Sequence, residues 1–218
     1  MSTDKHTQRA MARFDDWSRT YDEDRISAWL KFYQSLAMSK LRISEGWGFL
    51  DVGCGTGWAV REAADRLTFG TACGIDISPR MIEKAMAHSP KRDNIEFRVA
   101  NSEAIPYPDD SFGSIVCTCS FHHYQNPIRA LSEMKRVMKH GGRLVILDAA
   151  RDVSFAIWLQ DRWRRYCERS HVVYYTTREL ELLVSKAGLI LLDHILTIKK
   201  FMDHNKMFTG LMLIQCTK

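Results

Sequence analysis

The chain has 218 residues, 45% of them hydrophobic, and carries a formal net charge of +5 from 31 basic and 26 acidic residues. This length is sufficient for one well-buried domain and short for two, and so small a charge does not indicate a nucleic-acid partner. No run approaches eighteen apolar residues, and the polar first residues lack the apolar segment of a signal peptide. We therefore expect one cytoplasmic domain spanning residues 1–218.

Residues 9–41 are predicted to form a helical segment. Phe14, Trp17 and Tyr21 recur on one face of it, and a broad apolar stripe follows that suits packing against a sheet. The stripe consists of Ile26, Trp29, Leu30, Phe32, Tyr33, Leu36 and Leu41.

A short apolar strand that ends with Leu50 and Val52 leads into a loop with glycines at positions 53, 55 and 57. Glycines at every second position let the backbone turn where side chains would collide, which is typical of a ligand loop. A helix is expected at 58–66, and the free amide groups of its first turn then favour a carboxylate or a phosphate. The dinucleotide fingerprint would need a third glycine at Trp58, so this spacing disfavours NAD.

A second strand at residues 71–77 contains an acidic residue, Asp76, near its end. Ser78 and Pro79 suit the N-cap and the first turn of the helix that follows. Asp76 therefore lies at the carboxyl end of the next strand in a βαβ unit. A carboxylate at that place can accept hydrogen bonds from both ribose hydroxyls of a nucleoside cofactor.

Three more strands are expected at 95–99, 115–119 and 143–148, with a helix from Pro127 to Lys139 before the last of them. The strand at 115–119 leads into Ser-Phe-His-His-Tyr, which places His122 and His123 at the edge of the sheet. The chain's six cysteines have neither a CxxC pair nor the spacing of zinc ligands, and no metal-binding set stands out. Cys117 and Cys119 are expected to share one strand face as core residues.

A further helix is predicted at 154–170, with Ser154 as its cap. One face is aromatic and the rest is basic through Arg162, Arg164, Arg165 and Arg169. Three interpretations remain open: a packed amphipathic helix with solvated arginines, a contact with a lipid surface, or a clamp on an anionic substrate.

The chain ends with a helix at 177–187 and two strands, at 189–198 and about 207–216. Thr176 or Thr177 suits the cap of that helix, and Gly188 suits its end. Strands that alternate with helices and then follow one another directly predict an α/β fold with helices on both faces of the sheet. The expected sheet is doubly wound and mostly parallel, with seven strands and a reversed last strand.

Four stretches resemble motifs of one enzyme family over nearly the whole chain. Asp51-x-Gly-x-Gly-x-Gly resembles motif I of the class I S-adenosylmethionine-dependent methyltransferases, whose fold is Rossmann-like. Phe14-Asp15-x-Trp17-x-x-x-Tyr21-Asp22 resembles the N-terminal segment of the ubiquinone/menaquinone C-methyltransferase-like group. Residues 100–108 resemble its Gly-Asp-Ala-Glu-x-Leu-Pro-Phe motif, and residues 139–144 its Lys-Pro-Gly-Gly-x-Leu turn.

The resemblance implies S-adenosylmethionine as the cofactor. It also implies that segment 9–41 covers the cofactor and that residues 150–175 form a lid-like insertion over the methyl acceptor. The cofactor-binding residues that it implies are Tyr21, Asp51, Gly53, Cys54, Gly55, Gly57, Asp76, Ile77, Asn101, Ser102, Glu103 and Cys119.

The chain departs from the family pattern at two positions. Asn101 stands where the family usually has Asp, and a correctly turned amide carbonyl can still accept a hydrogen bond from the adenine amino group. Gly113 stands where family members often have Asp.

Methyl transfer is an in-line displacement, so alignment of the reactants and exclusion of water are the main tasks. A neutral imidazole could remove a proton from the acceptor, which makes His122, and after it His123, the candidate base. No Asn/Asp-Pro-Pro-Tyr/Phe motif of amino-methylating enzymes follows the fourth strand, and no Pro-Cys pair of cytosine methyltransferases is present.

The favoured function is methylation of a small hydrophobic or aromatic molecule, with quinone-like C- or O-methylation preferred. Two alternatives stay open: a non-catalytic S-adenosylmethionine-binding sensor or partner subunit, and an NAD-dependent oxidoreductase. The helix at 154–170 is a candidate peripheral membrane contact, and the oligomeric state is left open.

Overall fold

The computed structural model describes residues 5–21, 25–43, 46–168, 170–198, 201–203, 206–208 and 210–218. Of the residues discussed above, Asp22 and Arg169 lie outside the described residues, as do the side chains of Ile26, Trp29 and Leu30. Within the described part, no helix combines the length and apolar character needed to cross a membrane.

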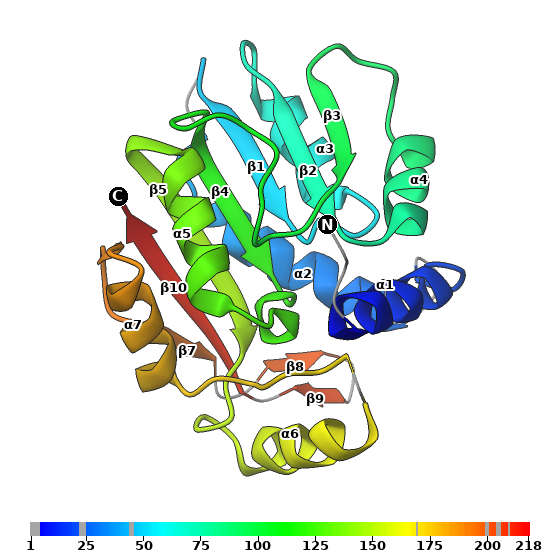
Figure 1. Cartoon of the computed structure of the whole chain (residues 1–218), viewed down its shortest axis with the longest axis vertical. Coiled ribbons are helices and arrows are strands. Elements are labelled where there is room, and N and C mark those ends of the chain that lie inside the picture. Colours follow the sequence, from blue (N-terminus) through cyan, green and yellow to red (C-terminus); the bar gives the residue numbers. More distant parts are fainter. Residues whose placement is uncertain are drawn as a thin grey trace.

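The centre of the molecule is a mostly parallel sheet with the strand order β3-β2-β1-β4-β5-β10-β6 (Figure 1). Its main strands are β1 (Gly48–Val52), β2 (Ala72–Asp76), β3 (Ile95–Val99), β4 (Phe112–Thr118), β5 (Met138–Ala149) and β10 (Leu211–Thr217). The first five run parallel, and β10 runs antiparallel to β5. The predicted reversal of the last strand is therefore confirmed.

In the part of the chain that the structure describes, the sheet has eight strands rather than the predicted seven. The predicted strand at 189–198 is divided into β6 (Ile190–Leu191) and β7 (Leu196–Ile198), and both pair with β10. A separate hairpin of β8 (Phe201–Asp203) and β9 (Lys206–Phe208), which the sequence analysis did not predict, precedes β10.

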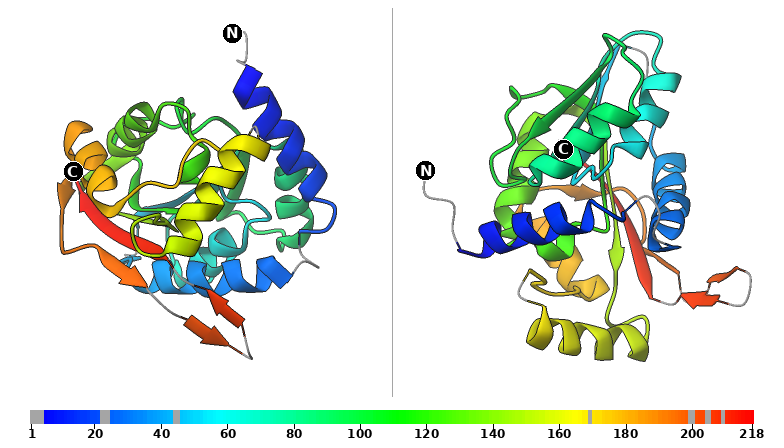
Figure 2. Two further views of the ribbon diagram at one scale, coloured as in Figure 1. Left: turned by 90° about the horizontal axis from the view of Figure 1, so that it is seen from below. Right: turned by 90° about the vertical axis from the view of Figure 1, so that its right-hand side faces the viewer.

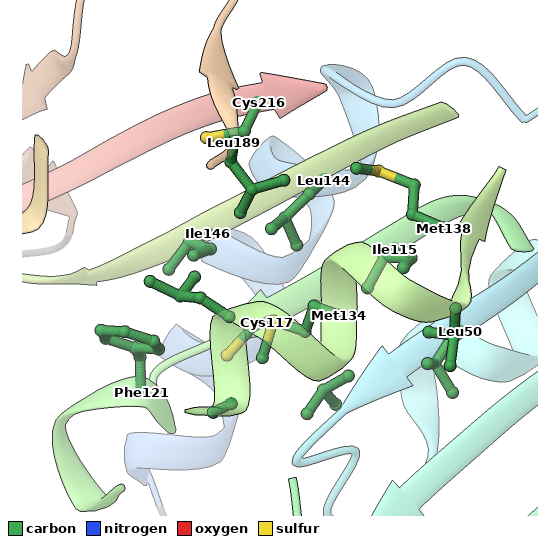
Figure 3. Packing of buried hydrophobic residues seen from close by; sticks show 14 of the residues in the cluster. Leu50, Ile115, Cys117, Phe121, Met134, Met138, Leu144, Ile146, Leu189 and Cys216 are labelled. Atoms are coloured by element: carbon green, nitrogen blue, oxygen red, sulfur yellow. The ribbon is translucent and has the colours of Figure 1, made fainter. Parts of the chain in front are cut away.

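Helices cover both faces of the sheet, as predicted. Side chains of α2 (Arg25–Ser39) and α3 (Trp58–Arg66) pack on one face, and those of α5 (Pro127–Val137) and α7 (Thr177–Lys186) pack on the other. On the second face, Leu50, Ile115 and Ile146 from the strands gather beneath Met134 of α5 (Figure 3). Because successive residues of a strand point to opposite faces, the long apolar runs of β4 and β5 supply both cores.

Local capping explains where several helices begin. Ser78 accepts a hydrogen bond from the Met81 amide at the start of α4 (Pro79–His88), and Thr176 forms a capping box with Glu179 at the start of α7. Asn126 caps α5 in the same way through the Arg129 amide. These side chains satisfy amide groups that the first helical turn leaves without partners.

Some predicted boundaries were wrong because distant segments pair with them. The helix at 127–139 ends two residues early, since Met138 pairs with Phe112 and thereby starts β5. The predicted helical segment at 9–41 contains, among its described residues, most of α1 (Lys5–Trp17) and all of α2. Helix α1 lies with α6 (Phe155–Cys167) at the edge where the parallel strands end (Figure 1, Figure 2).

Packing explains why Gly113 replaces the acid that the family pattern leads one to expect. A Cβ atom at Gly113 would lie 2.1 Å from Cε3 of Trp47 and 2.7 Å from its Cβ. Real side-chain atoms do not approach so closely, so the Trp47 indole occupies the space that a side chain at position 113 would need.

We predict that Gly113→Ala lowers the free energy of unfolding by about 1–3 kcal/mol, because the added methyl group must displace the Trp47 ring. Chemical denaturation of the single and double variants measures this cost. In a Trp47→Ala background the same substitution should cost markedly less, as expected for two residues in contact. An equal cost in both backgrounds would show that Trp47 is not the obstacle.

Candidate active site

A cavity of about 800 Å³ opens at the edge of the sheet where the parallel strands end. Residues from α1, from the loops after β1 to β4, from the end of β5 and from α6 line it. Most of the residues predicted to bind the cofactor lie on its surface: Tyr21, Gly53, Gly55, Asp76, Ile77, Asn101, Ser102, Glu103 and Cys119. His122 and His123 line it as well, whereas Asp51, Cys54 and Gly57 do not.

The three glycines of the loop after β1 all adopt positive φ, but they face different neighbours. A Cβ at Gly53 would lie 2.5 Å from the Ser120 hydroxyl, and one at Gly57 would lie 2.6 Å from the Phe97 ring. At Gly55 the nearest atom would be the Tyr21 hydroxyl oxygen, at 3.6 Å. Gly53 and Gly57 therefore permit close packing, while a Cβ at Gly55 would only reach van der Waals contact with Tyr21 on the cavity surface.

Asp76 connects the end of β2 to this glycine loop by a hydrogen bond. Its Oδ2 accepts a hydrogen bond from the Gly55 amide, and its Oδ1 accepts one from the Ser78 amide, both at 2.9 Å. Burial raises the pKa of the Asp76 carboxyl, and the two amides oppose that shift. Each carboxylate oxygen can accept a further hydrogen bond, so the group remains able to bind a ligand's hydroxyls.

Asp51 lies beneath the loop and away from the cavity surface. It is fully buried, and neither carboxyl oxygen has a hydrogen-bond partner among the described residues. Burial, with the negative charge of Asp76 nearby, raises the pKa of Asp51 to about 8. The carboxyl group is therefore mostly protonated at neutral pH, when it costs less to bury.

The segment after β3 contributes a polar rim to the cavity. The Asn101 side-chain carbonyl accepts a hydrogen bond of 2.9 Å from the Glu103 amide. The Glu103 carboxylate accepts one of 2.9 Å from the Asn126 amide, which connects this rim to the start of α5. The Asn101 oxygen retains a second lone pair, and Ser102 also lies on the cavity surface.

Two sets of polar contacts hold helix α1 against the cavity. Asp15 accepts hydrogen bonds from the Ser78 hydroxyl and from the Arg80 amide at the start of α4. Arg13 donates to the Ser170 hydroxyl at 2.9 Å and forms an ion pair with Glu168, just beyond α6. These contacts connect the N-terminal segment with both the glycine-loop side and the α6 side of the cavity.

His122 is held by a buried carboxylate. Its Nδ1 lies 2.7 Å from Asp148 Oδ1, and its backbone amide donates to Asp148 Oδ2 at 2.9 Å. Because an ionised carboxylate can only accept, Nδ1 carries the proton and Nε2 retains its lone pair. Asp148 and His122 both line the cavity, so the pair presents a basic nitrogen there.

His123 is oriented differently. Its Nδ1 donates to the Ser170 carbonyl at 2.8 Å, and its ring packs edge-on against Phe14 at 5.0 Å between centroids. Burial and the adjacent His122 hold the pKa of His123 well below its ordinary value. The ring is therefore neutral.

Cys117 and Cys119 do not share one face, contrary to expectation. Cys117 packs with the α5 and α7 side of the sheet, and Cys119 contacts the opposite core. Strand β4 ends at Thr118, and Cys119 has a φ of 52°, which breaks the alternation of side chains. The two thiols are thus not arranged as a pair.

Several cavity residues were not predicted from the sequence. Ser120 and Tyr124 flank the histidine pair, and their hydroxyl groups lie 3.0 Å apart. Tyr174 comes from the chain after α6 and approaches the His122 ring with 4.8 Å between centroids. The position of Ser120 and Tyr124 beside the histidines was a usable signal, whereas nothing in the local sequence singles out Tyr174.

The family model described as "Methyltransferase domain" matches residues 50–146. A demethylmenaquinone methyltransferase from Tropheryma whipplei (strain Twist) is 33% identical over 167 residues, which cover 74% of this chain and 68% of that protein. The chain belongs to the class I S-adenosylmethionine-dependent methyltransferases. The chain is also 39% identical over 116 residues to the ubiquinone/menaquinone biosynthesis C-methyltransferase UbiE of Geobacter sulfurreducens. That alignment covers 51% of this chain and 45% of the Geobacter protein.

The fold of this chain matches that of a methyltransferase solved in complex with the Haloferax volcanii methyltransferase activator Trm112. The TM-score is 0.80 at 20% identity, with 94% of this chain and 96% of that chain covered. At this identity the likeness supports the fold alone. This chain uses S-adenosylmethionine as its cofactor. The comparisons favour neither an NAD-dependent oxidoreductase nor a non-catalytic S-adenosylmethionine-binding protein.

Proposed function

We propose that this methyltransferase transfers a methyl group to a small hydrophobic acceptor with a quinol-like aromatic ring. The central observation is that the carboxylate of Asp76, bonded to the glycine loop, and the His122–Asp148 pair face one cavity. The names of the demethylmenaquinone and ubiquinone/menaquinone relatives supply the acceptor class.

The cofactor-binding roles are assigned from the groups that each residue exposes. Asp76 would accept hydrogen bonds from the two ribose hydroxyls, and Gly55, on the cavity surface, would lie beside the methionine part. Asn101 and the Ser102 amide would bind the adenine edge. Asp51, Cys54 and Gly57 would support the loop from behind, because none of them lines the cavity.

The remaining predicted residues complete the enclosure. Gly53 would accompany Gly55 beside the methionine part, Ile77 would contact the adenine ring, and Tyr21 would form a wall. Glu103 would hold the adenine rim in place through its bond to the Asn126 amide. Cys119 lies beside the histidines and would border the place where the acceptor and the cofactor meet.

S-adenosylmethionine supplies an electrophilic methyl group on a sulfonium centre. The protein must therefore hold a nucleophilic acceptor in line, exclude water, and accept the proton that the acceptor loses. We assign the last task to Nε2 of His122, whose other ring nitrogen is bonded to Asp148. That bond would orient the ring and stabilise the imidazolium that forms.

The walls away from the glycine loop favour an apolar acceptor. Helix α1 contributes Phe14 and Trp17, α6 contributes Ile157, and β10 contributes Leu211 to the cavity. Aromatic and aliphatic walls of this kind bind apolar rings by excluding water from both surfaces. We propose that the segment at 9–41 covers the cofactor and that the segment at 150–175 covers the acceptor.

The outer face of α6 fits a bilayer surface as the place where a hydrophobic acceptor is collected. Phe155, Leu159, Trp163 and Tyr166 lie on one helical face and are 76%, 55%, 61% and 92% exposed, respectively. Arg162, which lies over the Trp158 ring, adds positive charge beside them. Exposed aromatic residues with neighbouring arginines suit the interface of an anionic membrane. The inner face of the same helix lines the cavity, so α6 would connect membrane and site.

The acceptor assignment predicts methyl transfer to a reduced 1,4-naphthoquinol that lacks the ring methyl group, and none to the oxidised quinone. Only the reduced ring is electron-rich enough to act as a nucleophile. Transfer of labelled methyl from S-adenosylmethionine, measured with both redox forms, tests this. Absence of transfer to any quinol or phenol would contradict the proposal.

The same assay should find kcat for His122→Asn about 10²–10⁴-fold lower, because asparagine keeps a donor for Asp148 and lacks the basic nitrogen. The KM for the cofactor should change little. His140→Asn, at an exposed position in β5, is the matched control. A His122→Asn enzyme with full kcat would remove His122 from the chemistry.

The membrane assignment predicts that the protein sediments with vesicles of phosphatidylglycerol and phosphatidylcholine and much less with pure phosphatidylcholine. Trp163→Ser should weaken partitioning by about 1.5 kcal/mol, roughly tenfold, since the indole no longer leaves water. Phe69→Ser is the control, because Phe69 is 68% exposed and lies far from α6 in the sequence. Equal binding of all three proteins, or binding to neither lipid mixture, would refute the contact.

A further inference from the structure

Three histidine rings meet beside the cavity although they come from two separate segments. His122 and His123 follow β4, and His171 lies in the chain after α6. One ring nitrogen from each residue lies within 4.8 Å of one from both of the others. His122 and His171 are buried, and His123 is partly buried. The histidines therefore form a compact group that could share one ligand.

One nitrogen of each ring is held by a neighbouring oxygen atom. His122 Nδ1 bonds to Asp148, and His123 Nδ1 donates to the Ser170 carbonyl. His171 Nε2 lies 2.9 Å from Asp161 Oδ1. Histidines that bind metals usually donate their other ring N–H group to a carboxylate or a carbonyl, which sets the tautomer and the ring orientation.

Asp161, the partner of His171, is itself well anchored. It is only 2% exposed, its Oδ1 accepts a hydrogen bond of 2.6 Å from the Tyr174 amide, and its Oδ2 pairs with Arg165 at 2.8 Å. The carboxylate therefore stays ionised and oriented. A buried acid with three partners positions the His171 ring more firmly than packing alone would.

The decisive observation concerns Nδ1, the other ring nitrogen of His171. The His171 side chain is fully buried, and its Nδ1 has no hydrogen-bond partner among the described residues. A buried polar atom without a partner carries a free-energy cost, and a bound ligand is one explanation for it. In His122 and His123, Nδ1 is bonded to Asp148 and to the Ser170 carbonyl, respectively. In these two rings, Nε2 is therefore the nitrogen that could bind a ligand.

We propose that His122 Nε2, His123 Nε2 and His171 Nδ1 bind a divalent transition-metal ion of the zinc type. Three neutral imidazoles suit Zn²⁺ or Co²⁺, and nitrogen ligands lie about 2.0–2.1 Å from such an ion. The rings would have to draw slightly closer than their present separation. Because His122 and His123 line the cavity, a fourth ligand could reach the ion from it.

This metal site would take part in the proposed methyl transfer, and its role in activating the acceptor rests on that proposed function. The lone pair of His122 cannot accept a proton while it binds a metal ion. With the ion bound, an oxygen of a quinol-like acceptor would occupy the fourth position, and the ion would favour transfer of its proton to solvent water. The metal-bound and metal-free proteins would thus activate the acceptor by different groups at one place.

Titration of the whole protein with Co²⁺, followed by visible absorption without cofactor or acceptor, tests the site separately from methyl transfer. We expect one equivalent to bind with the spectrum of a low-coordinate nitrogen-ligated ion and to be displaced by Zn²⁺. His171→Gln should weaken binding at least tenfold, because it keeps a donor for Asp161 but lacks the Nδ1 lone pair. His123→Asn keeps the donor to Ser170 and provides a second test should the first variant fold poorly.

His140→Asn is the control and should bind Co²⁺ as the unaltered protein does. Failure of the unaltered protein to bind one equivalent would overturn the site, even if methyl transfer were normal. Unchanged affinity in folded His171→Gln or His123→Asn would overturn it as well. If methyl transfer fails while Co²⁺ binds as expected, the acceptor assignment fails and the metal site stands.

Discussion

The structure depends on the hydrogen bond that the Asp76 carboxylate accepts from the Gly55 amide. This single contact joins the end of β2 to the loop after β1, so two neighbouring parallel strands share one ligand surface. The Asp76 side chain is partly buried, and burial raises the pKa of its carboxyl group. Hydrogen bonds from the Ser78 and Gly55 amides offset part of that shift, because hydrogen bonds to an ionised group stabilise it. The loop conformation and the charge thus support each other, and Gly55, which adopts a positive φ, lies on the cavity surface.

The topology places the remaining groups around this contact. In a parallel sheet the carboxyl ends of neighbouring strands meet at one edge, which brings the segments after β3, β4 and β5 to the same cavity. Helix α1 closes one side through Asp15 and Arg13, and α6 closes another. The wall at Asp76 is polar and bonded to backbone amides, whereas α1, α6 and β10 contribute the apolar side chains of Phe14, Trp17, Ile157 and Leu211. That division matches an enzyme that aligns two reactants.

Local patterns in the sequence predicted the elements whose determinants are local. The helix at 58–66, the strand at 95–99 and the cap at Ser78 depend on nearby residues, and the structure has each at its predicted place. The end of α5 and the start of β5 could not be predicted in this way, because the pairing of Met138 with Phe112 decides them. The β8–β9 hairpin was missed for the related reason that its strands are only three residues long.

The site shows the same division. Asp76 and the glycines were identifiable because their spacing defines a motif, and the comparisons confirm the family and the cofactor. The third histidine was not, since His171 becomes significant only where the fold sets it beside His122 and His123. The spacing of residues along the sequence therefore could not indicate the metal site proposed above. The separation of Asp51 from the cavity surface likewise follows from its burial and not from its position in the motif.

The central claim is that Asp76 binds the cofactor ribose while it holds the glycine loop. Calorimetric titration with S-adenosylhomocysteine, comparing the unaltered protein with Asp76→Ala, tests it most directly, with the exposed Asp93→Ala variant as control. We predict that Asp76→Ala weakens binding by about 1.5–3 kcal/mol, because charge-assisted hydrogen bonds are lost, while Asp93→Ala binds normally. Unchanged affinity in a folded Asp76→Ala protein would contradict the account.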